Sequence, residues 1–328
     1  MLRDVKPNDW DLTTNAKPEE IQGVFEQAGF KTFYENAFGT VSILTGANDK
    51  SLAEVEITPF RTESKYTDKR HPDSVKFVKT LEEDLARRDF TVNALALTEK
   101  KKNIEIFDLF NGQKDLENKI IRAVGKPDDR FKEDALRMMR AVRFAVCLGE
   151  KPWAIEETTQ KAIVKNANLL NAIAKERIKD ELIKIIMHKN GSVGIELLRE
   201  LGLLQYIIPE LLEGFGVDQN KHHSYEVYQH NILSLEYACK KDYSLEVRLA
   251  ALLHDIAKPK TKQGEGENAT FYGHEIIGAK MAKKILENLK FPKKEIEKIT
   301  KLVRYHLFYY NTGEVGEASV RRLLRNVG

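Results

Sequence analysis

Three carboxylate side chains lie in two short runs that alternate between apolar and polar residues. Asp9 and Asp11 are two positions apart, so on a strand both side chains point to the same face. Glu56 lies in a second alternating run, residues 53–58. Carboxylates on one face can hold Mg²⁺ ions, which clamp a triphosphate and lower the pKa of an attacking hydroxyl. An isolated Asp-x-Asp more often belongs to a turn or a helix N-cap, so this interpretation depends on the motifs that follow.

A cation, a carboxylate and an amide are grouped within residues 87–93, which read Arg-Arg-Asp-Phe-Thr-Val-Asn. The guanidinium of Arg88 suits phosphate oxygens, and the carboxylate of Asp89 suits a ribose hydroxyl. Asn93 lies four residues after Asp89. The motif could therefore hold a nucleotide at both ends. Taken alone, it would be read as a solvated charge run that caps a helix beginning near Thr91.

A third motif, Glu133-Asp134-Ala135-Leu136-Arg137, is predicted to open a long helix. On such a helix Asp134 and Arg137 are i and i+3 neighbours and point the same way. They would offer an acceptor and a fork of donors, the groups needed to read the Watson–Crick edge of a base. The alternative is an ordinary intrahelical salt bridge between Glu133 and Arg137.

Taken together, the order and wording of these motifs resemble the bacterial-type tRNA nucleotidyltransferases (CCA-adding enzymes) and the related bacterial poly(A) polymerases over nearly the whole chain. The resemblance implies that the catalytic and nucleotide-binding residues are Asp9, Asp11, Glu56, Arg88, Asp89, Asn93, Glu133, Asp134 and Arg137. Asp9 and Asp11 would bind Mg²⁺, and Asp89 would select ribonucleotides. The substrates would be CTP and ATP, and the partner would be the tRNA 3′ end.

Three further segments are similar to parts of the same family. Residues 61–72 resemble the flexible loop that helps the family switch from CTP to ATP, and residues 108–116 resemble its hinge-like motif. Residues 176–182 resemble the neck motif that braces the amino-acid template. A loop that is complete in this way counts against an enzyme that adds only two cytidines.

The start of the chain departs from the family pattern. The family places a glycine pair before the metal motif, where backbone N–H groups grip the triphosphate. Here the first glycine is Gly23, and only eight residues precede Asp9. We therefore expect that an upstream segment is missing or that the start codon is misplaced. We also expect the chain as written to be a weak or inactive nucleotidyltransferase.

A second group of metal-ligating residues begins beyond residue 220. It comprises His230, the dipeptide His254-Asp255, and the later His274 and His306. Imidazoles and a carboxylate from separate helices can form a divalent-metal site after folding. This arrangement resembles the HD phosphohydrolase superfamily, and His230, His254 and Asp255 match its first ligands. The closing aspartate of that superfamily is not evident.

Composition is consistent with an enzyme of several domains in a reducing compartment. The chain has 328 residues and a formal net charge of +3, so any affinity for RNA must come from local patches. Its two cysteines, Cys147 and Cys239, lie in apolar helical surroundings and indicate buried thiols. Neither a signal peptide nor a membrane-spanning apolar run is evident. We expect a cytoplasmic protein that does not bind membranes.

The predicted fold class is α+β, because short β-branched runs alternate with helical patterns in the first third of the chain. These runs include residues 40–44 and 104–107, and a helix is expected over 81–96. From about Arg130 onward the pattern is helical. We predict a nucleotidyltransferase head at 1–124, a helical neck at 125–210 that binds RNA and nucleotide, and an HD-type helical domain at 211–328.

The function predicted from these features is addition of CCA to tRNA 3′ ends. One alternative is a poly(A) polymerase, against which the HD-like region counts. A second is a metal-dependent phosphohydrolase with a degenerate head, which the missing glycine pair favours. A third is a non-catalytic RNA-binding protein. Nucleotide addition by the chain would discriminate among them.

Overall fold

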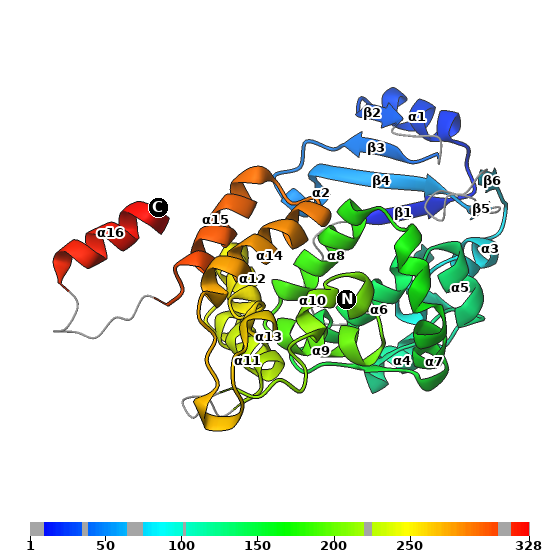
Figure 1. Cartoon of the computed structure of the whole chain (residues 1–328). Helices are drawn as coiled ribbons and strands as arrows, with labels where there is room; N and C mark the ends of the chain where they lie inside the picture. The colour runs from blue at the N-terminus through cyan, green and yellow to red at the C-terminus, as the bar shows by residue number, and fades with distance from the viewer. Residues whose placement is uncertain are drawn as a thin grey trace. The chain divides into compact units, whose positions relative to one another are not determined.

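The computed structural model describes residues 10–34, 39–63, 75–100, 103–219, 225–307 and 316–327. The chain forms two compact units, Met1–Asp134 and Ala135–Gly328. The first unit contains both strands and helices, and the second is almost entirely helical (Figure 1). The predicted fold class, an α+β head followed by helical domains, is confirmed. The division of the helical part into a neck and an HD domain stays a prediction.

The first unit is built on a four-stranded sheet with the strand order β1-β4-β3-β2. Strand β1 (Asp11–Thr14) runs parallel to β4 (Glu54–Pro59). Strand β3 (Val41–Leu44) is antiparallel both to β4 and to β2 (Lys31–Tyr34). Since side chains alternate between the two faces of a strand, the predicted alternating runs give the sheet one apolar face.

Helix α1 (Pro18–Gln27) packs on the apolar face of this sheet. The core consists of Ile21 from the helix and of Val41, Ile43 and Ile57 from the strands, all nearly fully buried. A proline in the first turn fixes the start of α1, because it lacks the N–H that would remain unpaired there. This packing holds β1 and β4, the two strands that carry predicted carboxylates, side by side.

The remaining elements of the first unit follow the sheet along the chain. They are α2 (Lys50–Ala53), β5 (Arg61–Glu63), β6 (Val75–Phe77), α3 (Leu81–Ala86), the 3₁₀ turn η1 (Thr91–Asn93), β7 (Leu95–Lys100), β8 (Asn103–Asp108), α4 (Gly112–Asn118), β9 (Ile120–Ile121) and α5 (Pro127–Glu133).

The helix predicted over 81–96 is therefore wrong beyond Ala86. The carboxylate of Asp89 accepts a hydrogen bond from the next backbone N–H, that of Phe90, at 2.9 Å. Such a local side-chain bond competes with the helical ladder. Residues from Leu95 onward instead pair with β8 as an antiparallel hairpin.

The second unit is built from helices of four to 15 residues. They are α6 (Leu136–Cys147), α7 (Glu157–Asn166), α8 (Lys175–Ile186), α9 (Gly191–Glu200), α10 (Pro209–Leu212), α11 (Val227–Lys240), α12 (Leu245–Leu253), α13 (Lys258–Thr261), α14 (His274–Asn288), α15 (Lys293–Arg304) and α16 (Glu317–Val327), with β10 (Ala154–Ile155) and the 3₁₀ turns η2 (Ala167–Ala172), η3 (Leu204–Tyr206) and η4 (Gly266–Asn268). Within the described residues, none of these helices has the length and apolar character that crossing a bilayer requires.

Candidate functional sites

Two of the three predicted carboxylates of the first unit lie on neighbouring strands. Asp11 of β1 pairs in parallel register with Glu56 of β4. Paired residues of adjacent strands project to the same face of a sheet, so the two carboxylates are neighbours there. Both residues are exposed. Asp9 lies outside the described residues. An exposed pair of oxygen ligands fits a hard divalent cation such as Mg²⁺.

The three polar residues of the central motif lie close together in the turn between α3 and β7. The Asp89 carboxylate accepts from the Asn93 side-chain amide at 3.2 Å, in addition to the Phe90 N–H. The guanidinium of Arg88 donates to the Asn93 carbonyl at 3.4 Å. Asp89 is only 8 % exposed, so these bonds fix the direction of its carboxylate. The nucleotide-binding roles of the three residues stay predictions.

The hinge-like segment is fastened to this turn through buried Asp115 of α4. Its carboxylate accepts from the Thr91 hydroxyl at 2.7 Å and from Arg122 Nε at 3.0 Å. Gly112 at the start of the same helix lies against the backbone of Thr91, and an added Cβ would collide with the Thr91 carbonyl oxygen. Only glycine allows this close approach.

Asp108 caps the same helix from the preceding strand. Its carboxylate accepts from the backbone N–H groups of Gly112 and Gln113 at 2.7 and 3.0 Å. Burial alone would raise the pKa of Asp108, but these hydrogen bonds outweigh it and lower the pKa. The capping carboxylate is therefore ionised at neutral pH.

The backbone at the predicted base-reading motif differs from the expected continuous helix. Helix α5 ends at Glu133, Asp134 is extended with φ −140° and ψ 105°, and α6 begins only at Leu136. Asp134 and Arg137 are therefore not i and i+3 neighbours on one helix, and that part of the prediction is wrong. Aspartate competes with the helical backbone for hydrogen bonds, which favours a helix end at this point. Glu133 pairs with Arg130, at 2.5 Å. The base-reading roles of Glu133, Asp134 and Arg137 stay predictions.

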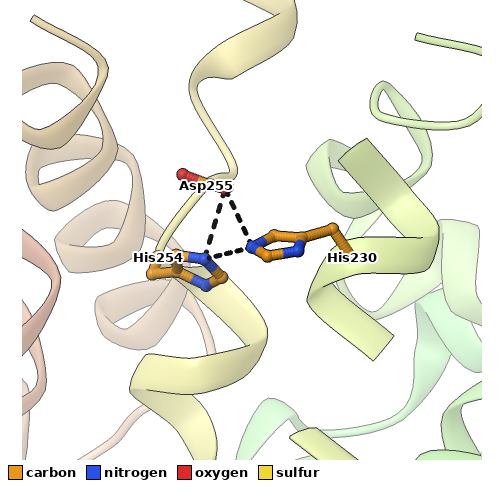
Figure 2. Close-up of side chains that lie close together, drawn as sticks. All are labelled: His230, His254 and Asp255. Carbon is orange, nitrogen blue, oxygen red and sulfur yellow. Dashed lines mark hydrogen bonds and ion pairs between the residues drawn. The ribbon is translucent and has the colours of Figure 1, made fainter. Parts of the chain in front are cut away.

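The predicted HD-type ligands meet in the second unit (Figure 2). His230 comes from α11, while His254 and Asp255 follow the end of α12. Asp255 Oδ2 lies 3.4 Å from His230 Nε2 and 3.2 Å from His254 Nε2, and the two imidazole nitrogens are 3.0 Å apart. The three side chains point toward one another and form a set that could hold one metal ion.

A second set of ligands shares the same carboxylate. Asp255 Oδ1 lies 3.2 Å from His274 Nε2 and 3.5 Å from His306 Nε2. Asp255, His274 and His306 form a second group whose ligand atoms lie close enough for one metal ion. Five residues therefore offer two adjoining sites that are bridged by one carboxylate. The sequence alone singled out both later histidines but did not divide the ligands between two sites.

Three of the imidazoles are oriented by the backbone. His254, His274 and His306 each donate from Nδ1 to the carbonyl three residues earlier, at 2.8, 2.6 and 2.7 Å. These bonds place the proton of the neutral ring on Nδ1 and leave the Nε2 lone pair facing Asp255. Lone pairs and a carboxylate that converge in this way attract a cation, so the site fits a divalent transition metal.

Asp255 is the most deeply buried member of the centre, at 2 % exposure. Burial alone would raise its pKa, but the surrounding imidazoles of His254, His274 and His306 outweigh burial and hold the pKa of Asp255 well below its usual range. The bridging residue is therefore ionised and ready to bind a cation.

Lys258 was missed by the sequence analysis. Its Nζ lies 2.8 Å from Asp255 Oδ2 and 2.5 Å from Gln219 Oε1, and the residue is 4 % exposed. The sequence feature that could have identified it is its position, three residues after the His-Asp dipeptide and so about one helical turn away. The centre lines a cavity of about 560 Å³, whose wall also includes Tyr272 and Leu307.

Three known protein-family models match successive stretches that together cover most of the chain. The family described as the poly A polymerase head domain matches residues 1–122. A probable RNA and SrmB-binding site of polymerase A matches residues 154–214, and an HD domain matches residues 221–325.

Curated relatives match at almost half of the aligned positions. The CCA-adding enzyme of Ligilactobacillus salivarius (strain UCC118) is 49% identical over 199 residues, which are 61% of this chain and 46% of that protein. The CCA-adding enzyme of Latilactobacillus sakei subsp. sakei (strain 23K) is 47% identical over 206 residues, 63% of this chain and 48% of that protein. The chain thus spans about half the length of the curated relatives that it matches.

Solved structures resemble the chain over almost its whole length. The Bacillus stearothermophilus CCA-adding enzyme in complex with CTP gives a TM-score of 0.59 at 27% identity, covering 99% of this chain and 74% of that one. A tRNA nucleotidyltransferase complexed with a primer tRNA and an incoming ATP analog gives a TM-score of 0.64 at 22% identity, covering 99% and 84%. The second likeness supports the fold alone.

Proposed function

We propose that this chain belongs to the family of poly(A) polymerase-type nucleotidyltransferases that includes the CCA-adding enzymes, and that it adds cytidylate and adenylate to tRNA 3′ ends. The observation that carries this proposal is the register of β1 and β4, which places Asp11 beside Glu56 on one face of the sheet. The substrates would be CTP, ATP and a tRNA that lacks its CCA end. The two free cysteines support a reducing compartment, the cytoplasm.

The proposed reaction is an in-line attack of the tRNA 3′ hydroxyl oxygen on the α-phosphorus of the nucleotide. A new phosphodiester bond forms, the bond between the α-phosphorus and the oxygen that bridges it to the β-phosphate breaks, pyrophosphate leaves with that oxygen, and the hydroxyl proton is lost to solvent. Arg88 would neutralise triphosphate oxygens, and Asp89 would accept a hydrogen bond from the ribose. Asn93 would hold Asp89 in place through the bond at 3.2 Å.

Members of this family depend on divalent metal ions, and we propose Mg²⁺ for the head. Asp11 and Glu56, with Asp9, would hold the ion through carboxylate oxygens, the ligands that Mg²⁺ prefers. When bound, the metal would polarise the α-phosphate and lower the pKa of the attacking hydroxyl.

The test is incorporation of labelled CTP and ATP into a tRNA transcript that ends before the CCA sequence. Wild-type chain, used in excess over tRNA because slow addition is expected, should extend it by two cytidylates and one adenylate, and Glu56→Gln should abolish extension. Glu54→Gln is the matched control, because Glu54 is exposed on the same strand two residues earlier. A long adenylate tail would identify a poly(A) polymerase. Loss of extension in Glu54→Gln but not in Glu56→Gln would reject the role of Glu56.

A second activity is favoured by the bridged ligand set of the second unit. We propose that this region binds two divalent metal ions through His230, His254, Asp255, His274 and His306 and hydrolyses phosphoesters. A bound metal would lower the pKa of a water molecule and polarise the phosphate. The test is release of phosphate from phosphomonoesters and opening of 2′,3′-cyclic nucleotides by the metal-loaded protein. Hydrolysis that survives in Asp255→Asn would reject this site.

A further inference from the structure

Asp84 of α3 is a buried carboxylate that holds two arginines. Its side chain is only 1% exposed. Oδ1 lies 2.8 Å from Arg87 Nη2 and 3.1 Å from Arg87 Nε, and Oδ2 lies 3.4 Å from Arg88 Nη2. A buried charge is stable only when it is paired and hydrogen-bonded, and here two guanidiniums fulfil that requirement. Arg88 is the residue proposed above to contact the triphosphate.

The same carboxylate is bonded to the first residue of the predicted flexible loop. Asp84 Oδ1 accepts from the Arg61 backbone N–H at 3.3 Å. Arg87 Nε, which binds Asp84, also donates to the Arg61 carbonyl at 3.1 Å. Both backbone groups of Arg61, the first residue of β5, are therefore held by α3. The base of the loop and Arg88 share one anchor.

The C-terminal end of α3 is also bonded to α5, the helix that ends at the predicted template. Arg130 of α5 donates from Nη1 to the Ala86 carbonyl at 2.9 Å and pairs through Nη2 with Glu133. The last carbonyl of the short helix α3 is thereby satisfied by α5. The last turn of α3 and its C-cap are thus bonded both to the loop base and to the helix that precedes the template segment.

We propose that Asp84 is a positioning residue. It keeps Arg88 and the base of the loop at Arg61 in a fixed arrangement. Through α3 it also holds α5, the helix that ends at the predicted template. This inference rests on the proposed nucleotidyl transfer. Asp84 itself would not contact the nucleotide. Its loss should leave the reacting groups in place but release the Arg88 guanidinium from its fixed direction, so nucleotide binding should weaken more than the chemical step.

The first experiment is a double-mutant cycle on KM and kcat for CTP and ATP, with Asp84→Asn, Arg88→Ala and the double variant. If Asp84 acts through Arg88, Asp84→Asn should raise KM by roughly tenfold or more, the loss expected for one charge-assisted hydrogen bond, with a smaller change in kcat. The loss in the double variant should then be clearly smaller than the sum of the two single losses. Asp84→Glu, which keeps the charge, should recover part of the KM loss.

The matched control is Glu83→Gln, since Glu83 is the acidic neighbour on the same helix, is exposed and accepts a local hydrogen bond from the Thr80 hydroxyl. Its effect should be small and additive with that of Arg88→Ala. Full additivity between Asp84→Asn and Arg88→Ala, or equal losses in kcat and kcat/KM with unchanged KM, would overturn the positioning role.

A second readout requires no catalysis. The Arg61 amide should exchange with deuterium at least about tenfold faster in Asp84→Ala than in wild type, because its acceptor is removed. It should exchange at the wild-type rate in Glu83→Ala. If wild type adds no nucleotide to tRNA, the proposed function fails, while faster exchange still supports the anchor. Unchanged exchange in a folded Asp84→Ala protein would overturn the anchor.

Discussion

Asp11 and Glu56 lie exposed on neighbouring strands of the first unit, whereas Asp255 in the second unit is 2 % exposed and surrounded by four imidazoles. In the first unit the strand register brings the carboxylates together, and water covers them. In the second unit hydrogen bonds from three imidazoles to backbone carbonyls fix the ligands. We expect the exposed pair to need its proposed substrate and metals for completion, whereas the fold itself organises the ligand set around Asp255.

The largest effect is expected from Asp11→Asn. If Asp11 binds metal as proposed, its loss removes several kcal/mol of transition-state stabilisation, so CTP incorporation should fall by about 10³-fold or more. Because Asp11 is exposed, the midpoint of thermal unfolding should hardly change. Incorporation of labelled CTP and a melting curve of the same preparation measure both effects. Wild-type incorporation by a folded Asp11→Asn protein would show that the exposed pair has no part in catalysis.

The second effect concerns the metal content of the buried centre. Asp255 belongs to both ligand groups, so Asp255→Asn should remove both ions, whereas His306→Gln should remove about one. Elemental analysis after dialysis against a divalent metal buffer gives the number of ions per chain. His188→Gln is the control, because His188 lies outside both groups and its Nδ1 accepts from the Asn190 backbone N–H. Equal metal loss in Asp255→Asn and His306→Gln would argue against a bridged pair.

Sequence patterns predicted best what depends on local periodicity. The alternating runs around Asp11 and Glu56 predicted two strands with carboxylates on one face, and both strands are found. Likewise, His254 and Asp255 follow an apolar helix as expected. The break at Asp134 was missed, because helical propensity in the surrounding residues is strong and the helix end is set by a single extended residue.

Contacts between distant segments could not be predicted. Asp84 lies in the stretch 81–96 that was predicted as a helix, but its partner in β5 is 23 residues away. Asp115 belonged to a recognised segment, yet its bond to Thr91 spans 24 residues. Lys258 is found beside Asp255 because α13 turns there, and Gln219, its second partner, lies 39 residues earlier. Such pairings depend on tertiary packing and have no periodic signature in one sequence.

The third prediction separates buried from exposed carboxylates within the first unit. Asp115→Ala leaves the Thr91 hydroxyl and Arg122 without their acceptor, so the free energy of unfolding of this unit should fall by about 1–3 kcal/mol. Glu117→Ala on the same helix should change it by at most about 0.5 kcal/mol, because Glu117 is exposed. Urea unfolding followed by circular dichroism measures both. Equal losses in the two variants would show that burial does not distinguish these carboxylates.

The smallest effect is expected from a surface ion pair between α12 and α15. Lys298 of α15 donates to the Glu246 carboxylate of α12 at 2.9 Å, and this hydrogen bond lowers the pKa of Glu246 to about 2 from its ordinary 4.5. A carboxyl whose pKa is lower in the folded than in the unfolded chain stabilises the fold at pH values above its unfolded pKa. That stability is lost as the pH falls toward 2. Because Lys298 is 53% exposed, the pair contributes at most about 1 kcal/mol.

Glu246→Gln should therefore lower the free energy of unfolding by less than about 1 kcal/mol near neutral pH, and the difference from wild type should shrink as the pH is lowered from about 7 to about 3. Urea titrations at several pH values measure this. The metal content should be unchanged, because α12 and α15 are packed against each other along their buried sides, which include Leu249 and Ile299. Loss of metal from Glu246→Gln would show that a surface ion pair, and not helix packing, holds His254 and His306 in place. The contrast between the prearranged centre around Asp255 and the exposed pair of the first unit would then fail.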